Sequence, residues 1–205
     1  MPNRTPGCTS TSFAKGLPAR VGIARRRLTL ARVAAILALC ATVVPHATAQ
    51  TTVALTYGER ESIARTEVAV MFPSHWAGTW GSVGWAVNWN VDVAEWRSHE
   101  DTENRKTLWD VGFTPSLRVR GDTTPIGRPF ADLGLGIHVL EDDHIGTKQL
   151  GLSWLFGEFG GVGLQFGAHD EFGVSVRVMH ESNGSIREPN NGLTAYMLRL
   201  EYAFE

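Results

Sequence analysis

Apolar and polar residues alternate along most of the chain from about Gln50 onward. In the clearest run, 83–94, valine and tryptophan occupy the odd positions, and glycine, alanine, asparagine and aspartate occupy the even ones. Successive side chains of a β-strand point to opposite faces, so a period of two predicts strands with one apolar face. The apolar spacing of an amphipathic helix is hard to find in this region. The pattern therefore predicts an all-β domain.

Eight alternating runs predict eight strands. Segments rich in glycine, proline, asparagine and aspartate separate them, as is typical of turns. The segments "PSHWAGTWG" (73–81) and "EDDHIGTKQ" (141–149) are both predicted to be loops of this kind. Strands of about ten residues with connecting turns account for the length of 50–205, as in an eight-stranded barrel. The predicted strands are 52–57, 66–72, 83–95, 109–120, 132–139, 161–167, 174–182 and 195–204.

The composition of the two strand faces indicates which face points outward. A soluble, lipocalin-like barrel carries its apolar residues inside, whereas a transmembrane barrel carries them outside. Here the apolar face holds bulky tryptophan, phenylalanine, valine and leucine, which would crowd the interior of eight strands. The other face holds mainly small residues with a few charges. We therefore predict an antiparallel, eight-stranded transmembrane β-barrel with its apolar face outward; the alternative is a secreted lipocalin-like barrel that binds an apolar ligand.

This prediction implies the location of two groups of side chains. Charged residues of the polar face should fill the lumen as ion pairs: Asp110, Asp132, Arg118, Arg177, Arg199, Glu201 and His138. Aromatic residues near strand ends should form girdles at the membrane interfaces: Trp76, Trp80, Trp96, Trp109, Tyr196 and Tyr202.

The first 49 residues differ from the rest and are predicted to be a cleaved signal peptide. An arginine-rich stretch precedes the apolar run 33–44, and Ala-Thr-Ala at 47–49 is a small-x-small cleavage site. Both cysteines, Cys8 and Cys40, lie in this segment, so residues 50–205 are predicted to have no thiol chemistry. A net charge of -2 gives no reason to expect nucleic acid binding. Export and barrel together predict the outer membrane of a Gram-negative bacterium.

Candidate chemistry lies in "VRVMHESNGSIREPNNG", 176–192, at the end of one predicted strand. His180 and Ser182 are two residues apart and share the apolar face, which looks toward lipid in the predicted barrel. A neutral imidazole that takes the proton of a serine hydroxyl is the minimal activated nucleophile for ester cleavage. Asn183 and the backbone N–H groups of the turn after Ser182 are candidate oxyanion donors. No metal site and no cofactor are predicted.

The same residues support a family resemblance. "HESNGSIREPNNG" resembles the H-x-S-N block of the PagL family of outer-membrane lipid A 3-O-deacylases. "PFADLGLGIHVLEDD" and "LGLSWLFGEFGGVGLQFG" are similar to two other family segments, in the same order. The resemblance implies an eight-stranded outer-membrane barrel that hydrolyses the ester-linked 3-O acyl chain of lipid A, its lipid partner. It implies Ser182 as nucleophile, His180 as base and Asn183 as an oxyanion donor.

The acid of the expected triad is where this chain departs from the family. The family places a glutamate twelve residues after the serine, and this chain has Thr194 there. A threonine hydroxyl accepts a hydrogen bond from the imidazole but offers no charge to the imidazolium. Glu188, in the following loop, is a candidate substitute, whereas Glu181 points to the opposite face. Three outcomes stay open: a dyad or threonine-supported triad, an acid from a loop, or a structural barrel with a degenerate site. The sequence leaves the oligomeric state open.

Overall fold

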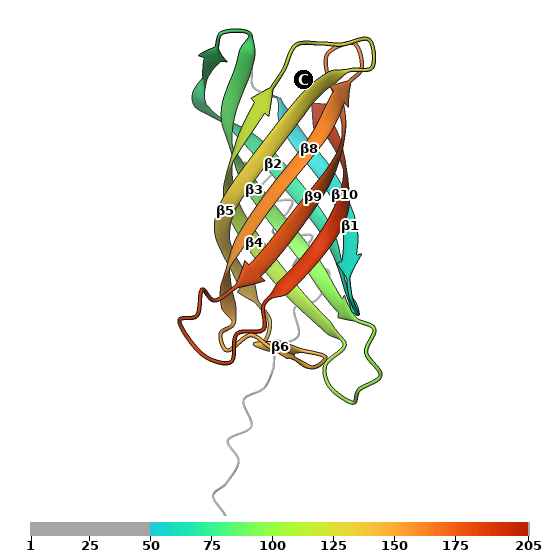
Figure 1. The fold of residues 1–205 in the computed structure, drawn as a ribbon, viewed down its shortest axis with the longest axis vertical. Helices are drawn as coiled ribbons and strands as arrows, with labels where there is room; N and C mark the ends of the chain where they lie inside the picture. Colours follow the sequence, from blue (N-terminus) through green and yellow to red (C-terminus); the bar gives the residue numbers. More distant parts are fainter. Residues whose placement is uncertain (1–49, 205) are drawn as a thin grey trace, which may run out of the picture.

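Residues 50–204 are described by a computed structural model and form a closed barrel of eight antiparallel strands (Figure 1). The spatial order is β1-β10-β9-β8-β5-β4-β3-β2, so the first and last strands pair and close the sheet. This confirms the predicted all-β, eight-stranded barrel. The barrel strands are β1 Thr51–Arg60, β2 Ile63–Trp80, β3 Val83–Ser98, β4 Thr107–Arg120, β5 Arg128–Leu140, β8 Trp154–Phe166, β9 Phe172–Ser182 and β10 Leu193–Phe204.

Two further points concern the predicted signal peptide and helices that could span a membrane. The predicted signal peptide, 1–49, with Cys8 and Cys40, lies outside the described residues. Within 50–204, no helix is long and apolar enough to cross a membrane.

The outward face of the barrel is apolar, as predicted. Leu133 is 65% exposed and Val176 59%, whereas their strand neighbours Asp132 and Arg177 are buried. The lipocalin-like alternative is wrong, because it requires the opposite orientation of these side chains.

Ion pairs fill the lumen. All seven side chains predicted to face it are buried. Arg118 donates to Asp132 and to Glu201 at 2.8 Å, and Arg199 donates to Glu67 at 2.9 Å. Mutual pairing of this kind satisfies charges that would be costly to leave alone in an interior closed to water.

The prediction that Trp96 belongs to an interfacial girdle is wrong. Its side chain is fully buried, and its Nε1 donates to Asp110 at 2.8 Å and to Glu181 at 3.2 Å. The reason is strand parity: odd positions of β3 face outward, and 96 is even. Trp76 and Tyr196, also predicted for the girdle, are 50% and 57% exposed.

Most of the predicted loop 73–81 is instead part of β2, and only Gly81 lies in the turn that follows. The strand continues to Trp80 across a register shift between Pro73 and Ala77, which indicates a β-bulge. A bulge accommodates a proline that a regular ladder would exclude. Stacking of Trp80 on Trp85, with ring centroids 5.6 Å apart, stabilises this extension of β2 and β3.

The predicted loop 141–149 contains a short hairpin, β6 His144–Ile145 with β7 Lys148–Gln149. Ile145 and the following Leu150 are fully buried, in one apolar cluster with Ile63, Trp96 and Leu193. The hairpin therefore covers the end of the barrel at which β9 ends (Figure 1).

Candidate active site

The candidate site lies where β9 ends, before the loop 183–192 that leads into β10. This is the barrel end that carries the β6–β7 hairpin, opposite the chain's C-terminus (Figure 1). His180 and Ser182 are partly exposed on the outward face, and Glu181 between them is fully buried. The alternation of β9 therefore gives the imidazole and the hydroxyl to the outside and the carboxylate to the lumen.

His180 is held by a hydrogen bond to Thr194. The two residues are directly opposite each other in the β9–β10 register, and His180 Nδ1 lies 2.8 Å from Thr194 Oγ1. Thr194 thus occupies the place expected for the acid. Gly192 leaves room for the ring, because a Cβ on this residue would lie 2.9 Å from His180 Cε1.

Ser182 shares the outward face of β9 with His180. Among the contacts of residues 50–204, no hydrogen bond joins the serine hydroxyl to the imidazole. Catalytic hydrogen bonds are often long or misaligned without substrate and tighten in the substrate complex.

Glu188, the predicted substitute acid, is not brought to His180. It lines a polar hollow of about 340 Å³ together with Asn104 and His144, in the loops that cover the barrel end. Two other hollows contain His180, and Glu188 lines neither.

The side chain of Asn183 holds the loop after β9, a role that the sequence did not indicate. The residue is fully buried, and its Nδ2 donates to the carbonyl oxygens of Leu150 at 2.7 Å and Arg187 at 2.6 Å. Both amide hydrogens are therefore committed to holding the loop. Gly184 and Ser185 are exposed, and no backbone hydrogen bond of the described residues uses their N–H groups, which remain candidate oxyanion donors.

Glu158, on β8, is a neighbour of His180 that sequence reasoning missed. It lies directly opposite His180 in the β8–β9 register and is exposed on the outward face. The parity of Val162, Leu164 and Phe166 on the same strand, extended backward, would have placed it there. Its pairing with His180 depends on the register between two strands, which alternation does not give.

An apolar groove of about 700 Å³ begins at His180 and Glu158. It crosses the outside of the barrel over β8, β5, β4 and β3, with walls that include Leu133, Leu135 and Val178. Its lining also includes Gly160, a residue of the outward face that has no side chain. An open apolar groove of this kind has the chemistry of a site for an extended apolar chain.

Contacts inside the lumen fix the position of Glu181, the residue between His180 and Ser182. Glu181 bonds the guanidinium of Arg65, accepts from Trp96 Nε1 at 3.2 Å and lies 3.3 Å from His138 Nδ1. These contacts immobilise the residue between His180 and Ser182, so the lumen network helps to hold the outward pair in place.

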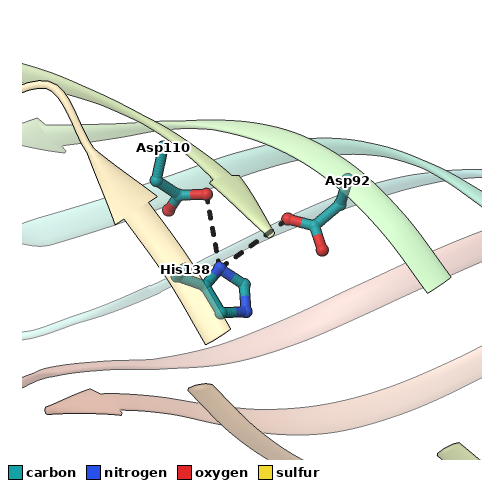
Figure 2. A group of neighbouring side chains, drawn as sticks. All are labelled: Asp92, Asp110 and His138. Carbon is teal, nitrogen blue, oxygen red and sulfur yellow. Dashed lines mark hydrogen bonds and ion pairs between the residues drawn. The ribbon is translucent and has the colours of Figure 1, made fainter. Parts of the chain in front are cut away.

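A group of buried side chains near this anchor has the composition of a metal site. Figure 2 shows His138 between Asp110 and Asp92, with Nδ1 3.5 Å and 3.9 Å from the respective carboxylates. Their possible ligand atoms lie within 4.8 Å of one another. The guanidinium of Arg65, however, lies 3.0 Å from both aspartates, so a cation of the chain already stands against them. The arrangement is an ion-pair network of the lumen.

Comparisons with known proteins show which family the chain matches. Residues 63–203 match the family described as lipid A 3-O-deacylase (PagL). Lipid A deacylase PagL of Pseudomonas aeruginosa is 28% identical over 112 residues, which are 54% of this chain and 60% of that protein. Lipid A deacylase PagL of Bordetella bronchiseptica is 26% identical over 170 residues, 80% of this chain and 89% of that protein.

A solved structure supports the fold. The crystal structure of the outer membrane enzyme PagL superposes with a TM-score of 0.63 at 20% identity. The superposition covers 74% of this chain and 98% of the other.

Proposed function

Because the chain belongs to the lipid A 3-O-deacylase (PagL) family, we propose that it is a serine esterase that removes the 3-O acyl chain of lipid A in the outer membrane. The nucleophile is Ser182 and the general base is His180. The observation that carries this assignment is the orientation of His180, whose Nδ1 lies 2.8 Å from Thr194 Oγ1 on the face that also bears Ser182. That face adjoins the apolar groove.

The chemistry follows from the two ring nitrogens. Donation from Nδ1–H to Thr194 leaves Nε2 as the basic nitrogen, which takes the Ser182 proton as the hydroxyl oxygen attacks the ester carbonyl. The backbone N–H groups of Gly184 and Ser185 stabilise the oxyanion. The tetrahedral intermediate collapses, and the imidazolium returns its proton to the departing sugar hydroxyl. Water, activated by the same nitrogen, then hydrolyses the acyl-enzyme and releases a fatty acid.

The outward position of the site suits a substrate that never leaves the membrane. Lipid A reaches the outside of the barrel laterally, and its acyl chain occupies the groove that ends at His180. No cofactor is required, because nucleophile, base and oxyanion donors are all parts of the chain.

The test is incubation of the folded protein with lipid A, followed by mass spectrometry. We expect loss of one hydroxyacyl chain, and Ser182→Ala and His180→Ala should each reduce the rate by at least about a thousandfold. Ser74→Ala, at the opposite end of the barrel, is the matched control and should keep full activity. Mobility of unheated samples in gels reports whether each variant is a folded barrel.

One outcome would replace this proposal by the degenerate-barrel alternative. That outcome is a wild-type protein that folds but leaves lipid A intact under conditions in which the Pseudomonas aeruginosa enzyme deacylates it. Full activity of folded Ser182→Ala would remove the assigned nucleophile.

A further inference from the structure

The proposed site lacks a charge at the position of its acid. When His180 takes the Ser182 proton it becomes an imidazolium, and an ionised acid normally both orients this ring and stabilises its charge. Thr194 performs only the first of these tasks, because its hydroxyl is neutral. A second group is needed for the second task.

Glu158 lies where such a charge would act. Residues directly opposite on neighbouring antiparallel strands have Cβ atoms about 4.5–5.5 Å apart. In the register, His180 has Thr194 opposite it on β10 and Glu158 opposite it on β8. The imidazole therefore stands between a neutral acceptor on one side and a carboxylate on the other, all three on the outward face.

The surroundings of Glu158 strengthen its attraction to a cation. Its opposite neighbour on β5 is Leu135, and Phe156 and Gly160 precede and follow it on the same face. No ion pair joins Glu158 to another described residue. A carboxylate in apolar, lipid-facing surroundings is unfavourable unless a cation approaches it. Charges also interact more strongly there than in water.

Other carboxylates near the site are occupied or misplaced. Glu181 is on the inner face, bonded to Arg65 and Trp96. Glu188 lines the separate polar hollow in the loops. Glu61 lines a second hollow with His180, but it is paired with Lys148 at 3.3 Å. Of the described carboxylates, Glu158 alone lines the apolar groove together with His180.

We propose that Glu158 is a positioning residue that stabilises the protonated form of His180, so that Thr194 and Glu158 divide the work of one triad acid. This inference rests on the proposed function. No hydrogen bond joins Glu158 to His180, so the carboxylate acts by its charge while Thr194 holds Nδ1.

The experiment is a set of four proteins assayed for kcat and KM on lipid A: wild type, Glu158→Gln, Thr194→Glu and the double variant. We expect Glu158→Gln to lower kcat by about tenfold or more with KM changed less than about twofold. Thr194→Glu should keep or raise activity. The double variant should recover the activity of Thr194→Glu, because a charge on β10 then replaces the one lost from β8.

Restoration from a different strand separates a charge effect from a packing effect. A merely structural role of Glu158 would not be repaired by a carboxylate on β10. Glu95→Gln, which removes an outward carboxylate paired with Arg97 at 3.1 Å on β3, is the matched control and should leave kcat unchanged.

Two results would overturn the inference and leave the proposed function standing. One is a folded Glu158→Gln protein with wild-type kcat; the other is a loss that Thr194→Glu does not restore. Each of these results is interpreted together with the activity of Ser182→Ala. If Ser182→Ala is inactive, only the role of Glu158 is refuted. If Ser182→Ala is active, the proposed function itself is refuted.

Discussion

His180 has two ring nitrogens, and the site depends on their different partners. Thr194 lies at hydrogen-bond distance from Nδ1, which leaves Nε2 for Ser182. A triad acid combines orientation with charge, and we propose that in this chain the two properties come from different strands. The hydroxyl of Thr194 therefore has a measurable role of its own, separate from that of Glu158.

Thr194→Val removes this hydroxyl at nearly constant volume. We expect kcat to fall about tenfold, because a lost hydrogen bond of roughly 1–1.5 kcal/mol no longer holds the productive ring orientation. Steady-state deacylation of lipid A measures the effect, and Thr194→Ser, which keeps the hydroxyl, is the control. Equal rates for the valine and serine variants would show that the hydrogen bond does not contribute.

At the scale of elements, β9 joins the lumen network to the outer surface. Its inward Glu181 is fixed by Arg65, Trp96 and His138, and its outward neighbours are His180 and Ser182. Next to it, β8 contributes the groove, because Gly160 leaves a gap between the large side chains of the outward face. A glycine here needs no unusual backbone conformation; its function is the space that it leaves.

Filling this gap tests whether the groove holds the acyl chain. A Cβ on Gly160 would lie 3.2 Å from Leu133 Cδ2, a contact that a small shift relieves, so Gly160→Ala should have a modest effect. Gly160→Leu should raise KM for lipid A about tenfold or more by occupying the groove, since each 1.4 kcal/mol of lost binding is tenfold. A short-chain ester should be cleaved at the wild-type rate by both variants. Unchanged kinetics of Gly160→Leu on lipid A would place the acyl chain elsewhere.

For the whole molecule, the orientation of the two strand faces determines everything else. Large apolar side chains face outward, charged pairs fill the lumen, and the site opens to the outside of the barrel. Membership of the lipid A 3-O-deacylase (PagL) family accords with this arrangement, because the substrate of such an enzyme is itself a membrane lipid.

The outward orientation of the apolar face can be tested by substituting a charged residue on it. Val176 is on β9 and 59% exposed. We expect Val176→Lys to lower the free energy of unfolding in lipid vesicles by about 2–4 kcal/mol, the cost of a cation near the middle of the bilayer. Val176→Leu should be nearly neutral. Urea titration followed by tryptophan fluorescence gives both values, and an equally stable lysine variant would argue that the face contacts water.

Much of this structure could be predicted from the local alternation of apolar and polar residues. It predicted eight strands and the common side of His180 and Ser182, because strand parity is a property of neighbouring residues. The composition of the two faces then predicted which of them points outward. Alternation failed where a longer-range cause acts. The segment 73–80 contains turn residues but continues β2 and pairs with β3. Trp96 is a different case, because its inward parity is itself local and was outweighed in the prediction by its large apolar side chain. The hairpin in 141–149 forms because Ile145 is buried against the barrel end.

By itself, the sequence determined which residues share a strand face, and hence which side chains could meet lipid. Only the tertiary structure decided which strands lie side by side and in what register, because that depends on closure of the barrel and on packing between distant segments. Thr194 was assigned to the site through the family resemblance, and its strand parity agreed with that position. Glu158 became a neighbour of His180 only through the pairing of β8 with β9.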